Sequence, residues 1–280
     1  MAINVLPIRR DIKFSLPKDR ALDWHRTGVH VSQFLNTMSL FFPVGERFFI
    51  DSVRAFRDQV DDPELKKAIT AFIGQEAMHG REHDELNDIL HELDIPVKAQ
   101  EHTVTRLLNL IQKTTPKAFQ LSATVALEHL TAIMGDAVLR NDEVFFTGAD
   151  PKFTALWRWH ALEETEHKAV AFDLYSQVMG KTLAAYSLRV ITLPIATGIF
   201  FALLYYYYAR NVAKAGGLTN IRGWITSLQF QWGRPGVLRQ AIKPWLDWFK
   251  PGFHPWDHDN RHFLESLDDL LGAVLEKEAA

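Results

Sequence analysis

Two glutamate–histidine pairs have a spacing that could bind metal. Glu76 and His79 are three residues apart, and Glu164 and His167 repeat that spacing. Because residues at i and i+3 share one face of an α-helix, each pair could hold one metal ion from a single helix. A short Glu-x-x-His motif is common in acidic helices, so its surroundings must show whether it is buried or only solvated.

The hydrophobic pattern places both pairs on faces that should be buried. Helical periodicity covers four segments, at about residues 31–60, 63–93, 116–140 and 151–179. In each segment apolar residues recur every three or four positions. Glu46 and Glu128 interrupt the apolar faces of the first and third segments, as the two pairs interrupt those of the second and fourth. Each expected helix therefore carries an acid at a comparable depth.

Four carboxylates in one core need compensating cations or protons, because burying an isolated charge costs several kcal/mol or more. Carboxylate and imidazole ligands without thiolate suit iron or manganese, and the chain contains no cysteine. We expect two iron ions, with manganese or a mixed manganese–iron pair as alternatives. The residues expected to bind them are Glu46, Glu76, His79, Glu128, Glu164 and His167.

The order of the segments predicts an all-α fold. Short loops within each pair of helices and a long link at 94–114 are typical of a ferritin-like four-helix bundle. We divide the chain into a lead-in (1–28), the bundle (29–180) and a hydrophobic, Trp-rich helical C-terminal extension (181–280). Pro43 predicts a kink or a fresh helix start in the first segment.

The motifs resemble those of the ferritin-like di-iron carboxylate superfamily, and the whole chain is most similar to the bacterial family described as predicted metal-dependent hydrolases. The resemblance rests on Pro43-x-Gly-Glu46-Arg47, Gln75-Glu76-Ala-Met-His79, Leu127-Glu128-His129 and His160-x-x-x-Glu164-x-x-His167. The last motif is similar to that of the arylamine N-oxygenases, di-iron enzymes with a third histidine ligand. This likeness implies that His160 is a seventh ligand; the alternative is a buried histidine that binds no metal.

Other polar residues lie close to the expected ligands. His83 is one helical turn beyond His79, and we predict that it orients a ligand by hydrogen bonding. Glu163 falls off the line of the fourth segment's ligands, so Glu164 is preferred. His129 points about 100° away from the preceding acid and is not expected to bind metal. The candidate catalytic residues are Glu46, Glu128 and His83.

An uncharged run at about 190–209 could reach across a bilayer by length. The tyrosines at its end, followed by Arg210 and Lys214, are typical of an interfacial anchor. The heavier basic flank follows the run, so a simple span would place the bundle outside the cytoplasm. We favour a helix that lies in the membrane surface, re-enters it or packs on the protein. Five tryptophans within 221–256 fit a membrane interface or ordinary packing equally well.

The composition narrows the classes of binding partner and the cellular location. A net charge of −3 and a pI near 6.5 argue against nucleic-acid binding. The first twenty residues contain no continuous apolar stretch of the kind found in signal peptides. We expect a cytoplasmic protein, with peripheral membrane association and a homodimer as arrangements that the sequence permits.

These features predict a di-iron oxidase or monooxygenase. It would use O₂, an electron donor and a small-molecule substrate that is apolar or lipid-like. The alternative is metal-dependent hydrolysis, in which the ions lower the pKa of a bound water. A third and weaker alternative is ferritin-like iron storage.

Overall fold

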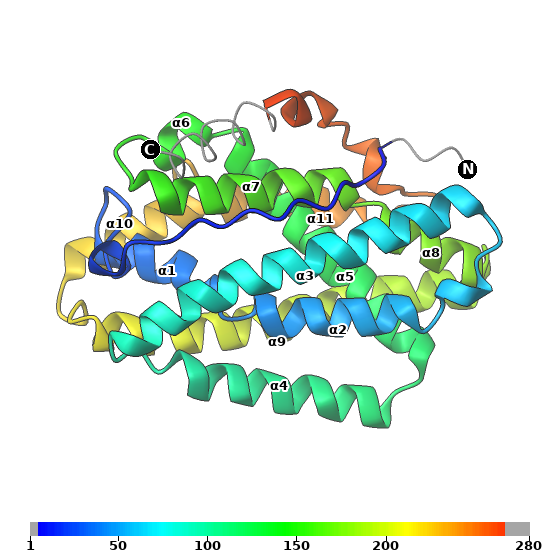
Figure 1. Ribbon diagram of the computed structural model, residues 1–280, viewed down its shortest axis with the longest axis horizontal. Helices are drawn as coiled ribbons and strands as arrows, with labels where there is room; N and C mark the ends of the chain where they lie inside the picture. Colours follow the sequence, from blue (N-terminus) through cyan, green and yellow to red (C-terminus); the bar gives the residue numbers. More distant parts are fainter. Residues whose placement is uncertain (1–4, 267–280) are drawn as a thin grey trace.

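The computed structural model describes residues 5–266, and within that range all regular structure is helical (Figure 1). The central bundle consists of α2 (Phe42–Arg54), α3 (Pro63–Glu92), α5 (Lys117–Leu139), α7 (Pro151–His167) and its continuation α8 (Val170–Met179). Around it lie α1 (Val29–Ser39), α4 (Val97–Thr114), α6 (Asp142–Phe146), α9 (Leu183–Lys214), α10 (Ile221–Trp232) and α11 (Val237–Asp247). The predicted all-α bundle is confirmed.

The two helices with Glu-x-x-His pairs begin in the same way. Asp62 precedes α3 and Asp150 precedes α7, and each carboxylate accepts hydrogen bonds from the backbone N–H groups of the second and third helical residues. Pro63 and Pro151 occupy the first helical position, where no N–H is needed. These caps fix where both helices begin, and therefore which residues face the core.

Two features of the helices differ from the sequence expectation, and a third agrees with it. The first segment contains two helices, as the alternative of a fresh start predicts, because Pro43 cannot continue α1 and lies in the first turn of α2. Most of the expected link at 94–114 is the 18-residue helix α4. The fourth expected helix is interrupted after His167, where the ammonium group of Lys168 turns to the carbonyl oxygen of His258 at 2.6 Å.

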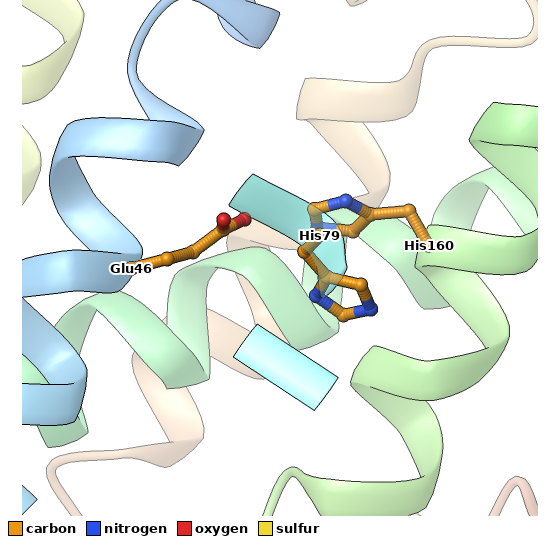
Figure 2. Close-up of side chains that lie close together, drawn as sticks. All are labelled: Glu46, His79 and His160. Carbon is orange, nitrogen blue, oxygen red and sulfur yellow. The ribbon is translucent and has the colours of Figure 1, made fainter. Parts of the chain in front are cut away.

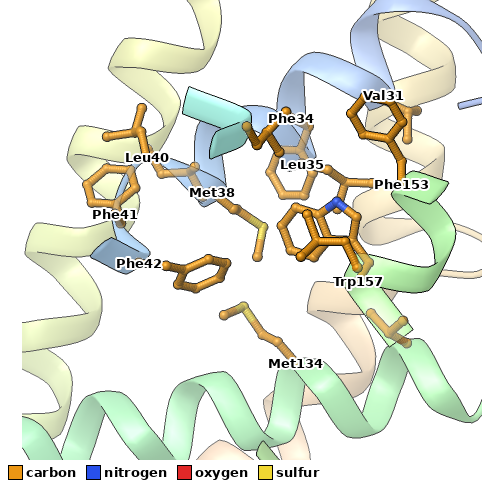
Figure 3. Packing of buried hydrophobic residues seen from close by; sticks show 14 of the residues in the cluster. Val31, Phe34, Leu35, Met38, Leu40, Phe41, Phe42, Met134, Phe153 and Trp157 are labelled. Atoms are coloured by element: carbon orange, nitrogen blue, oxygen red, sulfur yellow. The ribbon is translucent and has the colours of Figure 1, made fainter. Parts of the chain in front are cut away.

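The hydrophobic core is divided into two clusters along the bundle. One contains side chains from α1, the start of α2 and the first half of α7, among them Phe34, Phe42 and Trp157 (Figure 3). The other contains the end of α2, the first half of α3 and α8, including Phe72 and Leu174. On each bundle helix the predicted ligands lie between these clusters, so apolar packing closes the polar layer from both ends.

The segment before α1 crosses the bundle as an extended strap, which we define as residues 5–16. It lies over α3 and α7 (dark blue in Figure 1). Its own residues Ile12, Phe14 and Leu16 are buried. The backbone N–H of Phe14 donates to Glu82 at 3.0 Å. Residues 5–16 form neither helix nor strand, and they are attached to the core.

Helix α9 runs the length of the bundle. By length and composition it could cross a membrane, although 22% of its most apolar window is buried. Its inner side makes polar contacts with the bundle: Thr192 accepts from Ser122 of α5 at 3.0 Å, and Asn211 donates to Thr37 of α1 at 3.0 Å. One side of α9 therefore belongs to the protein interior and the other does not.

Candidate metal centre

The structure brings all seven predicted ligands together in the middle of the bundle. Each is at most 4% exposed. Their ligand atoms form three groups, each within 4.8 Å: Glu46, His79 and His160; Glu76, Glu128 and His167; Glu76, His79 and Glu164. Figure 2 shows the first group, with Glu46 extending from α2 toward the two imidazoles. Residues from four helices thus converge on one point, as a two-ion site requires.

Many polar atoms in this cluster lack hydrogen-bond partners among the described residues. Both carboxylate oxygens of Glu46, Glu76 and Glu128 are in this state, as are Nδ1 of His79 and Nε2 of His167. Although Nε2 of His167 lies 3.1 Å from Glu76 Oε1, the geometry is not that of a hydrogen bond. Buried polar atoms without partners are costly. Since all of these are good metal ligands in one small volume, the residues fit a pair of divalent cations.

The pKa shifts of the buried ligands also indicate a site for cations. Burial, followed by repulsion from neighbouring carboxylates, raises the pKa of Glu46, Glu76 and Glu128 well above the ordinary value. Burial likewise lowers the pKa of His79 well below its ordinary value. Divalent cations would reverse the first tendency by stabilising the carboxylates, and they would reinforce the second because they bind the neutral imidazole.

Two of the imidazoles that face the cluster are oriented by contacts to their outer ring nitrogens. Nε2 of His79 lies 3.1 Å from Oε2 of Glu163, which leaves Nδ1 facing the cluster. Nδ1 of His167 lies 3.0 Å from Oε1 of Gln75, which leaves Nε2 facing it. A hydrogen bond to the outer ring nitrogen fixes the tautomer and the ring orientation of a metal-binding histidine. Glu163, set aside as a ligand, is placed for this role.

Arg10 of the strap connects both of these contacts. Its guanidinium lies 3.0 Å from Glu163 and 2.8 Å from Glu166, and Glu166 accepts from Gln75. Sequence reasoning missed Arg10 and Glu166, and it named Gln75 in a motif without giving it a role. The available signal was that Glu163 and Glu166 flank ligand positions; nothing in the lead-in identified the arginine as their partner.

His83 contacts His160 rather than the other ligands. Its Nε2 lies 2.8 Å from Nδ1 of His160, and its Nδ1 lies 2.9 Å from the hydroxyl of Ser39. Both ring nitrogens of His83 are therefore engaged, while Nε2 of His160 lies 3.2 Å from Glu164. This geometry suits the predicted orienting role of His83, with His160 in the position of the ligand.

Of two further polar residues near the centre, Thr131 contacts a ligand and His129 does not. Thr131 donates to Oε2 of Glu164 at 2.6 Å. Despite burial, hydrogen bonds from the neighbouring imidazoles hold the pKa of Glu164 well below its ordinary value. His129 points away from the centre and stacks on Trp248, with its Nε2 3.2 Å from the carbonyl oxygen of Pro244.

An apolar cavity of about 320 Å³ adjoins the centre. Side chains of α2, α4, α5 and α9 line it, and Glu46 is the one ionisable residue among the described residues of its wall. Glu46 therefore belongs both to the metal centre and to the cavity. A methyl group added at Gly80 would approach Glu46 Oε2 to 3.1 Å, so α3 leaves this carboxylate just enough room. The apolar cavity therefore lies beside the candidate metal centre.

Comparison with known proteins gives one match. A family model described as "Predicted metal-dependent hydrolase" matches residues 8–259. No curated protein matches the chain, and neither does any solved structure. The matched region includes residues 8–16 of the strap with Arg10, all of the candidate ligands and the helices that line the cavity.

Proposed function

The chain belongs to the family of predicted metal-dependent hydrolases, and on this premise we propose that it is an enzyme with a two-ion centre between α2, α3, α5 and α7. The observation that carries the proposal is the convergence of buried carboxylates and imidazoles, eight of whose inward-facing atoms have no hydrogen-bond partner among the described residues. We assign the ions to Glu46, Glu76, His79, Glu128, His160, Glu164 and His167.

Hydrolysis is the reaction class that the family description supports. A bound divalent ion would polarise a carbonyl oxygen and lower the pKa of a water molecule. The apolar cavity suits the acyl part of an ester or amide substrate. Glu46 lies between cavity and ligands with both oxygens free of hydrogen bonds, so it can accept or return a proton beside the scissile group.

Oxygen-dependent oxidation is a second candidate, favoured by the dryness of the site. The cavity wall is almost wholly apolar and the ligands are nearly inaccessible to solvent, and such water exclusion protects reactive species from side reactions. A bound iron pair would supply the oxygen chemistry, with electrons from an external donor. The apolar cavity would then hold the C–H bond to be oxidised.

One experiment separates these classes. The protein is loaded in parallel with iron, manganese or zinc, and hydrolysis of p-nitrophenyl octanoate is measured in air and under nitrogen. A hydrolase turns over the ester under nitrogen and with zinc. Oxygen uptake by the iron form alone, with no ester cleavage, would instead establish the oxidation.

The assignment of the ligands has its own test. Glu76→Gln removes a buried carboxylate, whereas Glu64→Gln removes an exposed one from the same helix. We expect two metal ions per chain in the wild type and in Glu64→Gln, and about one or none in Glu76→Gln, measured by mass spectrometry. Full metal content in Glu76→Gln would refute the assignment.

A further inference from the structure

The outer side of α9 is an exposed apolar stripe. Ile191, Ile195, Ile199 and Tyr206 are 40–55% exposed and recur at helical spacing. The stripe is about 22 Å long at 1.5 Å per residue, and residues 190–209 contain no charge. Contiguous apolar patches of this kind mark interaction surfaces.

Helices α10 and α11 contact α9 and carry further exposed apolar side chains. Nε1 of Trp232 donates to the hydroxyl of Tyr205 at 3.1 Å, and Nε1 of Trp245 donates to Thr197 at 3.0 Å. The exposed large apolar side chains of these two helices are Ile221, Ile225, Leu228, Trp232, Ile242 and Leu246. We call the stripe of α9 together with these six residues the apolar face.

The charged residues in this part of the chain are all basic. Residues 174–246 contain eight lysines and arginines and no aspartate or glutamate, although the whole chain has a net charge of −3. Arg210, Arg222, Arg234 and Lys243 are all exposed. An apolar surface rimmed by basic residues complements an anionic lipid bilayer, whereas two copies of the same basic surface would repel each other.

The inner side of α9 excludes a simple membrane span. Thr192 and Asn211 make buried hydrogen bonds to α5 and α1, and Arg189 donates to the carbonyl oxygen of Trp248 at 2.7 Å. A helix fixed to the bundle along its length can present only its outer side to lipid. The bilayer would therefore contact α9 lengthwise.

The cavity beside the metal centre reaches this face. Ile195 and Ile199 belong to the exposed stripe and also line the cavity, together with Leu107 and Ile111 of α4. Glu46 lines the same cavity on the side of the ligands. An apolar chain passing between α4 and α9 would run from the apolar face to the metal centre.

We propose that the apolar face docks on an anionic bilayer and that an acyl chain from the bilayer enters between α4 and α9 to reach Glu46. The docking stands on the surface alone. The delivery of substrate rests on the proposed function, since it identifies the substrate as a membrane-borne acyl lipid.

Docking is tested by co-sedimentation of the metal-loaded full chain with vesicles. We expect binding to phosphatidylcholine vesicles containing 30% phosphatidylglycerol, and at least tenfold weaker binding to phosphatidylcholine alone. Leu228→Glu on the apolar face should weaken binding to the anionic vesicles at least tenfold. The control Val144→Glu changes a 52% exposed residue on α6, outside that face, and should bind as the wild type does.

Delivery is tested with deuterated palmitic acid carried in the same vesicles. After removal of the vesicles, mass spectrometry should find about one palmitate per wild-type chain. Ala196→Trp fills the cavity wall and should lower retention at least fivefold, whereas Ala202→Trp, on the exposed side of α9, should not.

The possible failures are distinct. Absence of vesicle binding, or binding unaffected by Leu228→Glu, overturns docking; a concentration-dependent dimer abolished by Leu228→Glu without vesicle binding would assign the face to a second copy. Vesicle binding without palmitate retention overturns delivery. Both assays also run on metal-free protein, and metal content and cleavage of a soluble ester are measured separately, so neither failure is confused with failure of the proposed function.

Discussion

Arg10 stabilises the metal centre through two carboxylates without being a ligand. It holds Glu163 behind His79 and Glu166 behind the Gln75–His167 contact. Replacing it with methionine keeps most of the side-chain volume but removes the charge. Because loss of such outer hydrogen bonds typically costs 10–100-fold in metal affinity, we expect Arg10→Met to weaken metal binding by about that factor, measured by competition with a chelator.

The matched control is Arg9→Met, which changes the neighbouring exposed arginine. It should bind metal as tightly as the wild type. Equal weakening by both changes would mean that the strap acts only through its general packing, not through the guanidinium of Arg10.

The buried carboxyl groups also make the stability of the metal-free protein depend on pH. Burial and carboxylate repulsion raise the pKa of Glu76 and Glu128 in the folded state. Groups of this kind stabilise the fold fully below their ordinary pKa and lose that contribution as pH rises through the folded value. The lowered pKa of His79 acts in the opposite direction, but its contribution is complete above about pH 6.5.

Between pH 6.5 and 8.5 the carboxyl effect lowers stability, and Lys168, whose pKa burial lowers to about 8, opposes it only toward the upper end of the range. We therefore expect the melting temperature of the metal-free protein to fall across this range, while metal-loaded protein, whose ligands are already deprotonated, changes less. Thermal scans of both forms at four pH values test this. A metal-free protein that melts at the same temperature throughout would show that these carboxyl groups are not protonated in the fold.

The close crossing of α5 and α7 controls the distance between Glu128 and the ligands on α7. At Gly135 an added Cβ would lie 3.4 Å from the Cα of Ala161, so one methyl group is just accommodated and a branched side chain is not. Gly135→Val should separate the helices and cost about 1–3 kcal/mol, measured by urea unfolding, with weaker metal binding. Gly198→Val is the control, since an added Cβ there meets no described atom within 4 Å.

The helices and their ligands were predictable for the same local reason. A repeat of three or four residues places Glu76 and His79 on the buried face whatever the rest of the chain does. Contacts between distant segments have no such signal: Arg10 meets Glu163 across 153 residues of sequence. Helix α4 has an amphipathic pattern that the expectation of a link did not use, and only its packing against α2 and α3 lacks a local signal.

At the level of the whole molecule, the C-terminal helices contribute buried side chains to the core and do not form a separate layer on its surface. Leu204 and Val212 of α9 are fully buried, and Trp248 is buried against Arg189 and Phe172. Only the outer side of α9 is free for other contacts. The same helix therefore closes the bundle, lines the cavity and provides the apolar face.

This arrangement predicts that residues 1–179 alone do not form a stable bundle. Removing α9 would expose the apolar sides of α1 and α5, and the truncated chain should lack near-UV circular dichroism and cooperative urea unfolding. Within the full chain, Leu204→Ala should cost about 2–5 kcal/mol as a buried truncation, whereas Ile199→Ala, at a site 40% exposed, should cost far less. A truncated chain that unfolds cooperatively and binds two metal ions would instead make the bundle an independent domain, because its core would then be complete without α9.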